Sequence, residues 1–295
     1  MKGGFLGVDI FFVISGYLIT NLLIRELNKG SFSYLNFFER RIRRIIPALY
    51  FVILITIPLS WNFLSSGLIW DYWQSVVASS IFVSNFLFAL ENNYFDISSD
   101  YKPLIHTWSL SIEEQFYIIF PFIFYLCFKI KNLFINILIL LFIISLLIFL
   151  YNPKIPIYFN INFLNRLNDI GLGSYYISIS RFWEIFLGSI ASYFSYKYKI
   201  KKFNFLSLFG LIVIFSIFIL YDENLLDKKI YILFITLSTT LVIVFTSYDS
   251  LVGKLLSNKF LVYIGLLSYS LYLVHQPIIT YMNIIYFEKN IEYYF

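Results

Sequence analysis

Charged residues, cysteine and histidine are scarce in this sequence of 295 residues. Only 13% of the residues are charged, against roughly 25% in ordinary soluble domains, and 60% are hydrophobic. A soluble globular domain and a disordered chain are therefore excluded, because a chain this apolar must bury its surface. Cys127 is the only cysteine, and His106 and His275 are the only histidines. This scarcity argues against a disulfide framework, a cysteine–histidine zinc site and a haem attachment motif, so we expect no bound metal.

Long apolar runs dominate the sequence, whose mean hydropathy is +0.78. A helix needs about 20 mostly apolar residues to cross a bilayer core, and several runs approach that length. They lie near residues 5–24, 45–60, 72–90, 112–128, 133–150, 180–196, 204–221, 230–247 and 259–279. Runs that are apolar on every side, rather than on alternate residues, indicate lipid-surrounded helices and not a barrel. We therefore predict an all-α, polytopic helical bundle in the membrane.

The net charge of +5 lies in short basic clusters between the apolar runs. This pattern marks cytoplasmic loops rather than nucleic-acid binding. The strongest clusters, in residues 25–44 and 197–202, are separated by five apolar runs, so one run must fail to cross if both clusters lie inside. The serine-rich run 72–90 is the best candidate for a re-entrant or interfacial helix. We predict about eight crossings plus this helix, in one domain over residues 1–295.

A turn of arginines directly precedes the second of these runs. Arg40, Arg41 and Arg44 share one face if the segment is helical, because their spacings are three and four residues. Guanidinium groups aligned in this way suit the phosphates of a nucleotide-type ligand. Anchoring of the helix at the cytoplasmic surface, with lipid headgroup contacts, is the alternative interpretation.

The segment from His106 to Tyr117 contains a second group of candidate polar side chains. We expect this segment on the outer side of the membrane. Ser111 and Glu114 fit a capping box that begins a helix, which leaves Glu113 without a structural explanation. A carboxyl at that place is partly desolvated, as general acid or base work requires. His106 could take a proton from a hydroxyl group, although a single loop histidine is more often an ordinary surface or interface residue.

Charged residues within the apolar runs are costly and must find partners. Arg181 and Glu184 are three residues apart on one helical face, which predicts a structural ion pair. Asp9, deep in the first run, must likewise be paired, protonated or at the interface.

A stripe of polar residues lies within the last apolar run. Ser268, Tyr272 and His275 lie along one side of a helix. Hydrogen bonding to a neighbouring helix is the favoured interpretation of this stripe, and contact with a substrate is the alternative.

These motifs resemble, in order and spacing, the integral-membrane acyltransferase type 3 family, which includes bacterial O-acetylases of lipopolysaccharide and peptidoglycan. The matching segments extend over nearly the whole chain, at residues 7–20, 40–47, 106–117, 181–188 and 268–277. The resemblance implies a multi-pass enzyme of the bacterial cytoplasmic membrane. Such an enzyme moves an acyl group, usually acetyl, from cytoplasmic acetyl-CoA to a hydroxyl group of an envelope or exported glycan.

The resemblance also implies roles for particular residues. The phosphates of coenzyme A would be bound on the cytoplasmic side by Arg40, Arg41 and Arg44. The acceptor side would contain catalytic Glu113 and His106, with substrate contacts from Trp108 and Ser109. Acyl-CoA is then a co-substrate rather than a bound cofactor, and the partners are the bilayer and a glycan, without nucleic acid.

Family members usually begin with a further helix that carries a basic residue and a histidine, and this sequence begins after that helix. We therefore expect a chain truncated at its start and also at its end, a start placed too late, or an inactive member. Two other functions stay open. A transporter or flippase of a lipid-linked or small polar molecule would also use buried charges, although no inverted repeat is apparent. A non-catalytic membrane scaffold would not depend on the charged motifs.

Overall fold

The computed structural model describes residues 2–91, 101–128, 130, 133–153, 171–198, 200–222 and 224–292. These residues form helices and connecting turns, without a strand among them. Six of their helical segments are long and apolar enough to cross a membrane: Gly3–Asn28, Tyr34–Phe63, Thr107–Phe128, Leu133–Tyr151, Lys228–Phe245 and Lys259–Tyr286. The protein is thus an all-α polytopic membrane protein, as predicted.

Two further helices fall on predicted crossings. Helix α8 (Ser178–Tyr198) has 21 residues but includes Arg181 and Glu184, and α9 (Asn204–Leu220) has 17 residues. The number of eight crossings therefore stays a prediction. Lys199, within the basic cluster 197–202, lies outside the described residues.

The chain divides into two compact units. Unit 1 comprises Met1–Phe32, Tyr117–Pro153 and Ile179–Ile264. Unit 2 comprises Ser33–Phe116, Lys154–Ser178 and Gly265–Phe295. Helices α5 (Thr107–Phe128) and α12 (Lys259–Glu292) contribute residues to both units.

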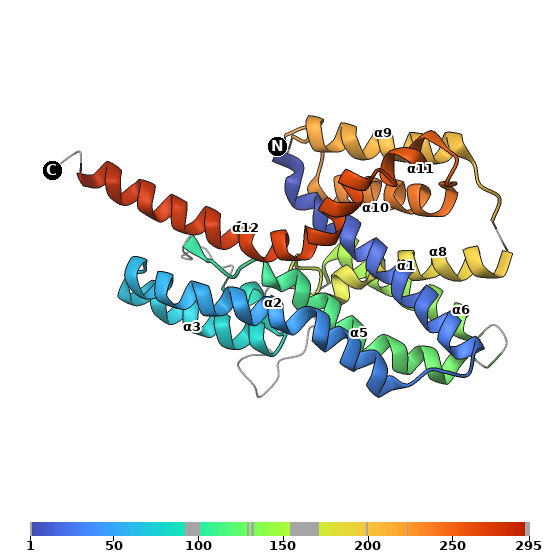
Figure 1. The fold of residues 1–295 in the computed structure, drawn as a ribbon, viewed down its shortest axis with the longest axis horizontal. Coiled ribbons are helices and arrows are strands. Elements are labelled where there is room, and N and C mark those ends of the chain that lie inside the picture. Colours follow the sequence, from blue (N-terminus) through green and yellow to red (C-terminus); the bar gives the residue numbers. More distant parts are fainter. Residues whose placement is uncertain are drawn as a thin grey trace. The chain divides into compact units, whose positions relative to one another are not determined.

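Unit 1 contains most of the helices. Besides α8 and α9 it includes the 3-10 helix η1 (Lys2–Leu6), α1 (Gly7–Asn28), α6 (Leu133–Tyr151), α10 (Lys228–Phe245) and α11 (Leu251–Leu256). Helix α9 packs along α10, and α10 also contacts α1 (Figure 1).

Two glycines bring the backbones of α1 and α8 into direct contact. A Cβ atom added at Gly16 would lie 1.9 Å from the carbonyl oxygen of Ile185. A Cβ atom at Gly188 would lie 2.0 Å from the carbonyl oxygen of Val13. Small residues at a helix crossing allow this close approach, which is a common way for membrane helices to associate.

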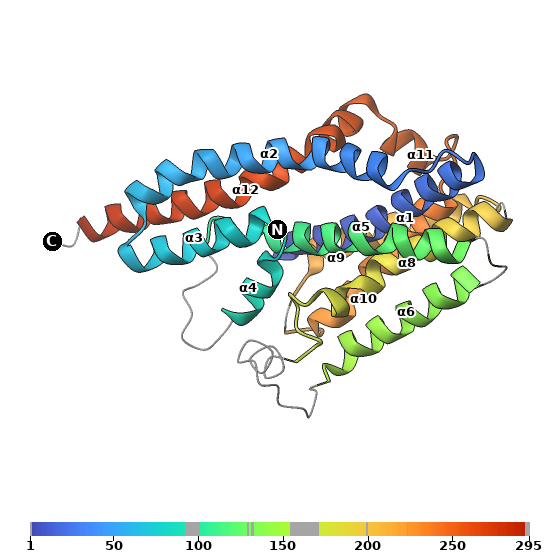
Figure 2. The same cartoon turned by 90° about the horizontal axis from the view of Figure 1, so that it is seen from below.

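Unit 2 is built around α2 (Tyr34–Phe63). Its first turn is capped by Ser33, whose side chain accepts a hydrogen bond from the backbone N–H of Asn36, so the arginine turn is helical, as the spacing argument assumed. Helix α2 contacts α3 (Ser66–Ser80) and lies beside the later part of α12 (Figure 2). There the Tyr281 and Ser60 hydroxyls are 2.6 Å apart.

The serine-rich run 72–90 is interrupted in the structure. Helix α3 has 15 residues, α4 (Ser84–Leu90) has 7, and Phe82 between them has a positive φ of 56°. Since a crossing helix needs about 20 residues, neither helix is long enough to span a bilayer, in line with the predicted non-crossing segment.

A ladder of buried hydroxyl groups joins α3 and α4 to α5. Hydrogen bonds of 2.7, 2.9 and 2.8 Å link Ser79 to Thr107, Thr107 to Ser84, and Ser84 to Ser111. Each of these side chains is buried. The ladder satisfies polar groups that would otherwise be costly in a low-dielectric environment.

The predicted capping box at Ser111 and Glu114 is wrong. Helix α5 begins at Thr107, so both residues lie inside it. Ser111 contacts Ser84 through the hydroxyl ladder, and Glu114 is only 8% exposed. The local pattern is overridden because tertiary hydroxyl contacts allow the helix to begin earlier than its apolar run.

Candidate active site

Polar side chains of unit 2 converge where α5 and α12 meet. The Tyr272 hydroxyl donates a hydrogen bond to the carbonyl oxygen of His106 at 2.7 Å. The same hydroxyl lies 2.5 Å from the Ser109 hydroxyl. The imidazole rings of His106 and His275 meet edge to face, with centroids 5.3 Å apart. The only two histidines of the sequence are therefore neighbours.

The exposed ring of His275 is held in one tautomer. Its Nδ1 atom lies 2.6 Å from the carbonyl oxygen of Tyr272. A carbonyl can only accept, so Nδ1 carries the hydrogen in the neutral ring and Nε2 keeps its lone pair. The side chain is exposed at this point. This is the arrangement that a proton acceptor requires.

His106 differs from His275 because it is buried, with only 5% of its surface exposed. Desolvation, followed by the charge of His275, lowers the pKa of His106 to about 3. His106 is therefore neutral at physiological pH. A group that binds a proton this weakly is a poor general base near pH 7.

Acidic side chains of α5 lie close to the arginine turn of α2. Arg41 interacts electrostatically with the buried Glu114. Arg44 interacts in the same way with Tyr269 of α12. Tyr269 also interacts electrostatically with Glu113 and Glu114. The two carboxyl groups and two of the three predicted phosphate-binding arginines thus share one neighbourhood.

This proximity corrects the predicted separation of the arginine turn from the Glu113 segment by the membrane. The prediction assigned Glu113 to the outer mouth of a helix that was expected to begin near residue 112. Because α5 begins at Thr107, Glu113 and Glu114 lie about two turns inside the helix instead. There Glu114 meets the positive charge of Arg41.

The arginine turn also differs from one residue to the next. Arg40 and Arg44 are exposed, and Arg41 is half-buried with its guanidinium 5.7 Å from the ring centroid of Phe37. Arg43, which has no predicted role, forms an ion pair of 2.8 Å with Glu39. The Arg43 side chain is thus paired within its own helix.

The predicted substrate-binding residues have separate surroundings. Ser109 joins Tyr272 and His106, as described above. Trp108 is 7% exposed, and its ring packs against Tyr175 and Tyr176 with centroid distances of 4.8 and 5.4 Å. Burial raises the pKa of the Tyr176 hydroxyl. Ser109 therefore belongs to the histidine cluster, whereas Trp108 is enclosed by aromatic rings.

His275 and Tyr272 are the site residues that the sequence interpretation missed, because helix packing was favoured for their stripe. Tyr272 does bond to another segment, as that interpretation predicts, but His275 presents an exposed imidazole beside His106. The scarcity of histidine in an apolar chain was the available signal. Ser268, on the same stripe, hydrogen-bonds to the Gly265 carbonyl of its own helix and takes no part.

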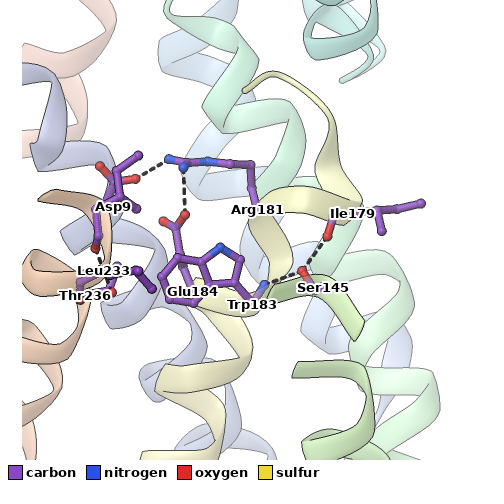
Figure 3. A network of polar contacts seen from close by, with 9 residues as sticks. Asp9, Ser145, Ile179, Arg181, Trp183, Glu184, Leu233 and Thr236 are labelled. Carbon is purple, nitrogen blue, oxygen red and sulfur yellow. Dashed lines mark hydrogen bonds and ion pairs between the residues drawn. The ribbon is translucent and has the colours of Figure 1, made fainter. Parts of the chain in front are cut away.

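A second polar cluster lies in unit 1 (Figure 3). Arg181 forms the predicted ion pair with Glu184 at 2.9 Å and also pairs with Asp9. Of the three alternatives predicted for Asp9, a paired, a protonated or an interfacial carboxyl, the structure shows the pairing. Across the described residues, no group of three or more histidine, cysteine, aspartate or glutamate side chains is arranged to hold a metal ion.

Comparison with known proteins supports the sequence resemblance. A family described as an acyltransferase domain matches residues 3–294. The chain belongs to this family. Two similar relatives are the O-acetyltransferase OatA of Staphylococcus aureus strains NCTC 8325 / PS 47 and COL, each 35% identical over 310 residues. These alignments cover 100% of this chain and 49% of the relative, so the chain spans about half the length of the curated relatives it matches. No solved structure matches the chain significantly.

Proposed function

We propose that this chain is a membrane O-acetyltransferase that moves acetyl from cytoplasmic acetyl-CoA to a hydroxyl group of a cell-envelope glycan, in the bacterial cytoplasmic membrane. Family membership and relatives named O-acetyltransferases support the reaction class. The observation that carries the proposal is a chain of contacts within unit 2. The arginine turn interacts with two carboxyl groups, and one of these, Glu113, interacts with Tyr272 beside the two histidines.

The donor is bound by Arg40, Arg41 and Arg44 in this proposal. Guanidinium groups bind phosphate oxygens through paired, charge-assisted hydrogen bonds, and coenzyme A offers several phosphates. Arg40 and Arg44 are exposed and accessible to such a ligand. Arg41, which also interacts with Glu114, links the donor side to the carboxyl groups.

The acceptor hydroxyl is activated by His275. Nε2 of His275 takes the hydroxyl proton while the oxygen attacks the thioester carbonyl carbon. The new carbon–oxygen bond forms, the carbon–sulfur bond breaks, and the coenzyme A thiolate leaves and recovers a proton. A positioned base contributes about 10²–10⁴ in rate. Glu113, which interacts electrostatically with Tyr272, stabilises the positive charge that the imidazole gains.

In this proposal the general base is His275, whereas the sequence interpretation named His106. His106 is too weak a base for this step and instead packs against the reacting ring as a positioning residue. Ser109 orients Tyr272, whose carbonyl fixes the tautomer of His275. Trp108 contributes to the aromatic wall with Tyr175 and Tyr176.

The arginine turn provides an internal control for the donor site. We expect Arg44→Ala to lower the ester-linked acetate of the envelope glycan by tenfold or more, because a phosphate contact is lost, and Arg43→Ala to leave it unchanged, because Arg43 pairs with Glu39. The measurement is the acetate released by mild base from cells that express each variant of the whole protein in place of their own enzyme. Equal acetate in Arg44→Ala and wild-type cells would contradict the proposal, as would equal loss in both variants.

A further inference from the structure

The strongest uninterpreted feature of the molecule is the charge cluster of unit 1. Asp9 on α1 and Arg181 and Glu184 on α8 are each 0% exposed. The guanidinium of Arg181 lies between the two carboxyl groups (Figure 3). The rings of Phe12 and Phe149 flank the guanidinium carbon with centroids at 5.7 and 5.9 Å. The charges therefore face one another and aromatic rings rather than water.

The formal charges of this cluster do not balance. Arg181 keeps its single positive charge in proteins, whereas Asp9 and Glu184 together carry two negative charges when both are ionised. The excess negative charge would be completely buried, which is strongly unfavourable unless it is neutralised.

In the part of the chain that the structure describes, the two lysines at the start of α10 have contacts away from these carboxyl groups. Lys229 of α10 donates to the Leu150 carbonyl at 2.9 Å, and the ammonium of Lys228 lies 4.5 Å from the ring centroid of Phe5. Tyr231 of α10 donates to the carbonyl of Asp222. Ser145 of α6 is occupied by the Ile179 carbonyl and the Trp183 N–H.

The two carboxyl groups face each other. Glu184 and Asp9 lie within hydrogen-bonding reach, although neither carboxylate can donate a hydrogen bond when ionised. Among the described residues, Asp9 Oδ2 and Glu184 Oε2 have no donor. A carboxyl proton supplies that donor and removes the excess charge together. A metal ion would instead lie beside the positive guanidinium and have only two carboxylates to bind it.

We propose that Asp9 and Glu184 bind one proton between them, so that the cluster forms a buried, electrically neutral proton site that joins α1 to α8. The proton completes a carboxyl–carboxyl hydrogen bond, and Arg181 pairs with the remaining negative charge. Because the backbones of α1 and α8 are in contact at Gly16 and Gly188, loss of the proton leaves an uncompensated charge in a tightly packed helix pair. This inference does not depend on the proposed function.

Charge counting predicts the stability of three variants. Glu184→Gln and Asp9→Asn each replace one carboxyl with a neutral amide and leave a neutral cluster, so we expect the melting temperature in detergent to stay within a few degrees of wild type. The double variant leaves Arg181 without a counter-charge, and we expect its melting temperature to fall by on the order of 10 °C. Glu39→Gln, at an exposed pair of unit 2, is the control for losing a surface carboxyl.

Infrared spectroscopy of the unmodified protein tests the proton directly. We expect a carbonyl band of a protonated carboxylic acid that persists at pH 8, shifts in heavy water and disappears in Glu184→Gln. The spectrum of the wild-type protein decides the question even if a variant fails to fold. Absence of such a band at pH 8, or a Glu184→Gln protein as unstable as the double variant, would overturn the proposal.

Discussion

The charge clusters of the two units use similar residue types in opposite ways. In unit 1, Asp9, Arg181 and Glu184 are completely buried and pair with one another between two helices in backbone contact. In unit 2, the arginine turn and His275 are partly or fully exposed beside buried partners. Charged groups that are fully buried and closed to ligands are suited to holding helices together. Charged groups that are exposed beside buried, ordered side chains are suited to binding a substrate and reacting with it. A charged residue within a membrane helix therefore does not by itself identify a reaction site.

The largest expected effect comes from breaking the cluster of unit 1. We expect Arg181→Met to destabilise the protein by about 3–5 kcal/mol, because it removes one partner from a buried ion pair. Arg43→Met, at an exposed pair of unit 2, is expected to cost less than about 1 kcal/mol. The measurement is the fraction of protein that stays monodisperse in detergent after heating. Similar losses in the two variants would remove the distinction between the units.

A smaller expected difference between the two units is the way in which their stability depends on pH. The pKa of His106 is about 3 in the folded protein, against about 6.5 in an unfolded chain. The unfolded chain therefore binds more protons between these values, and the folded state loses about 1.4 kcal/mol of stability per pH unit as pH falls below about 6.5. The proton site of unit 1 acts in the opposite direction, because its proton is lost as pH rises.

The contribution of His106 can be isolated by substitution. We expect the melting temperature of wild type to fall between pH 7 and pH 5 more steeply than that of His106→Gln. His275→Gln is the control, because it removes the exposed histidine and leaves the buried one. A slope that is unchanged in His106→Gln would contradict the assignment of His106 as a buried neutral group.

Much of the fold could be predicted because lipid-facing helices must be apolar throughout. The run 133–150 corresponds closely to α6 (Leu133–Tyr151). The beginning of α5 could not be predicted, because its first turns are polar and depend on hydroxyl partners from α3 and α4. The sequence shows that a buried serine needs a hydrogen-bond partner, but it does not show which distant residue is that partner.

The candidate site was only partly predictable for a similar reason. The pairing of Arg181 with Glu184 follows from a local spacing of three residues, and local spacing is visible in a sequence. The partner of His106 is His275, 169 positions later in the numbering of the chain. Nothing in the pattern of either segment specifies that meeting, and the tautomer of His275 depends on a backbone carbonyl.

Transfer of radiolabelled acetyl from acetyl-CoA to a glycan acceptor, with the whole protein reconstituted in lipid vesicles, tests the central claim most directly. We predict that His275→Ala lowers the rate by about 10²–10⁴ while its melting temperature stays near that of wild type, and that Ser268→Ala, on the same helix, transfers at the wild-type rate. Transfer by folded His275→Ala at the wild-type rate would contradict the claim that the acceptor hydroxyl is activated in unit 2 by this imidazole.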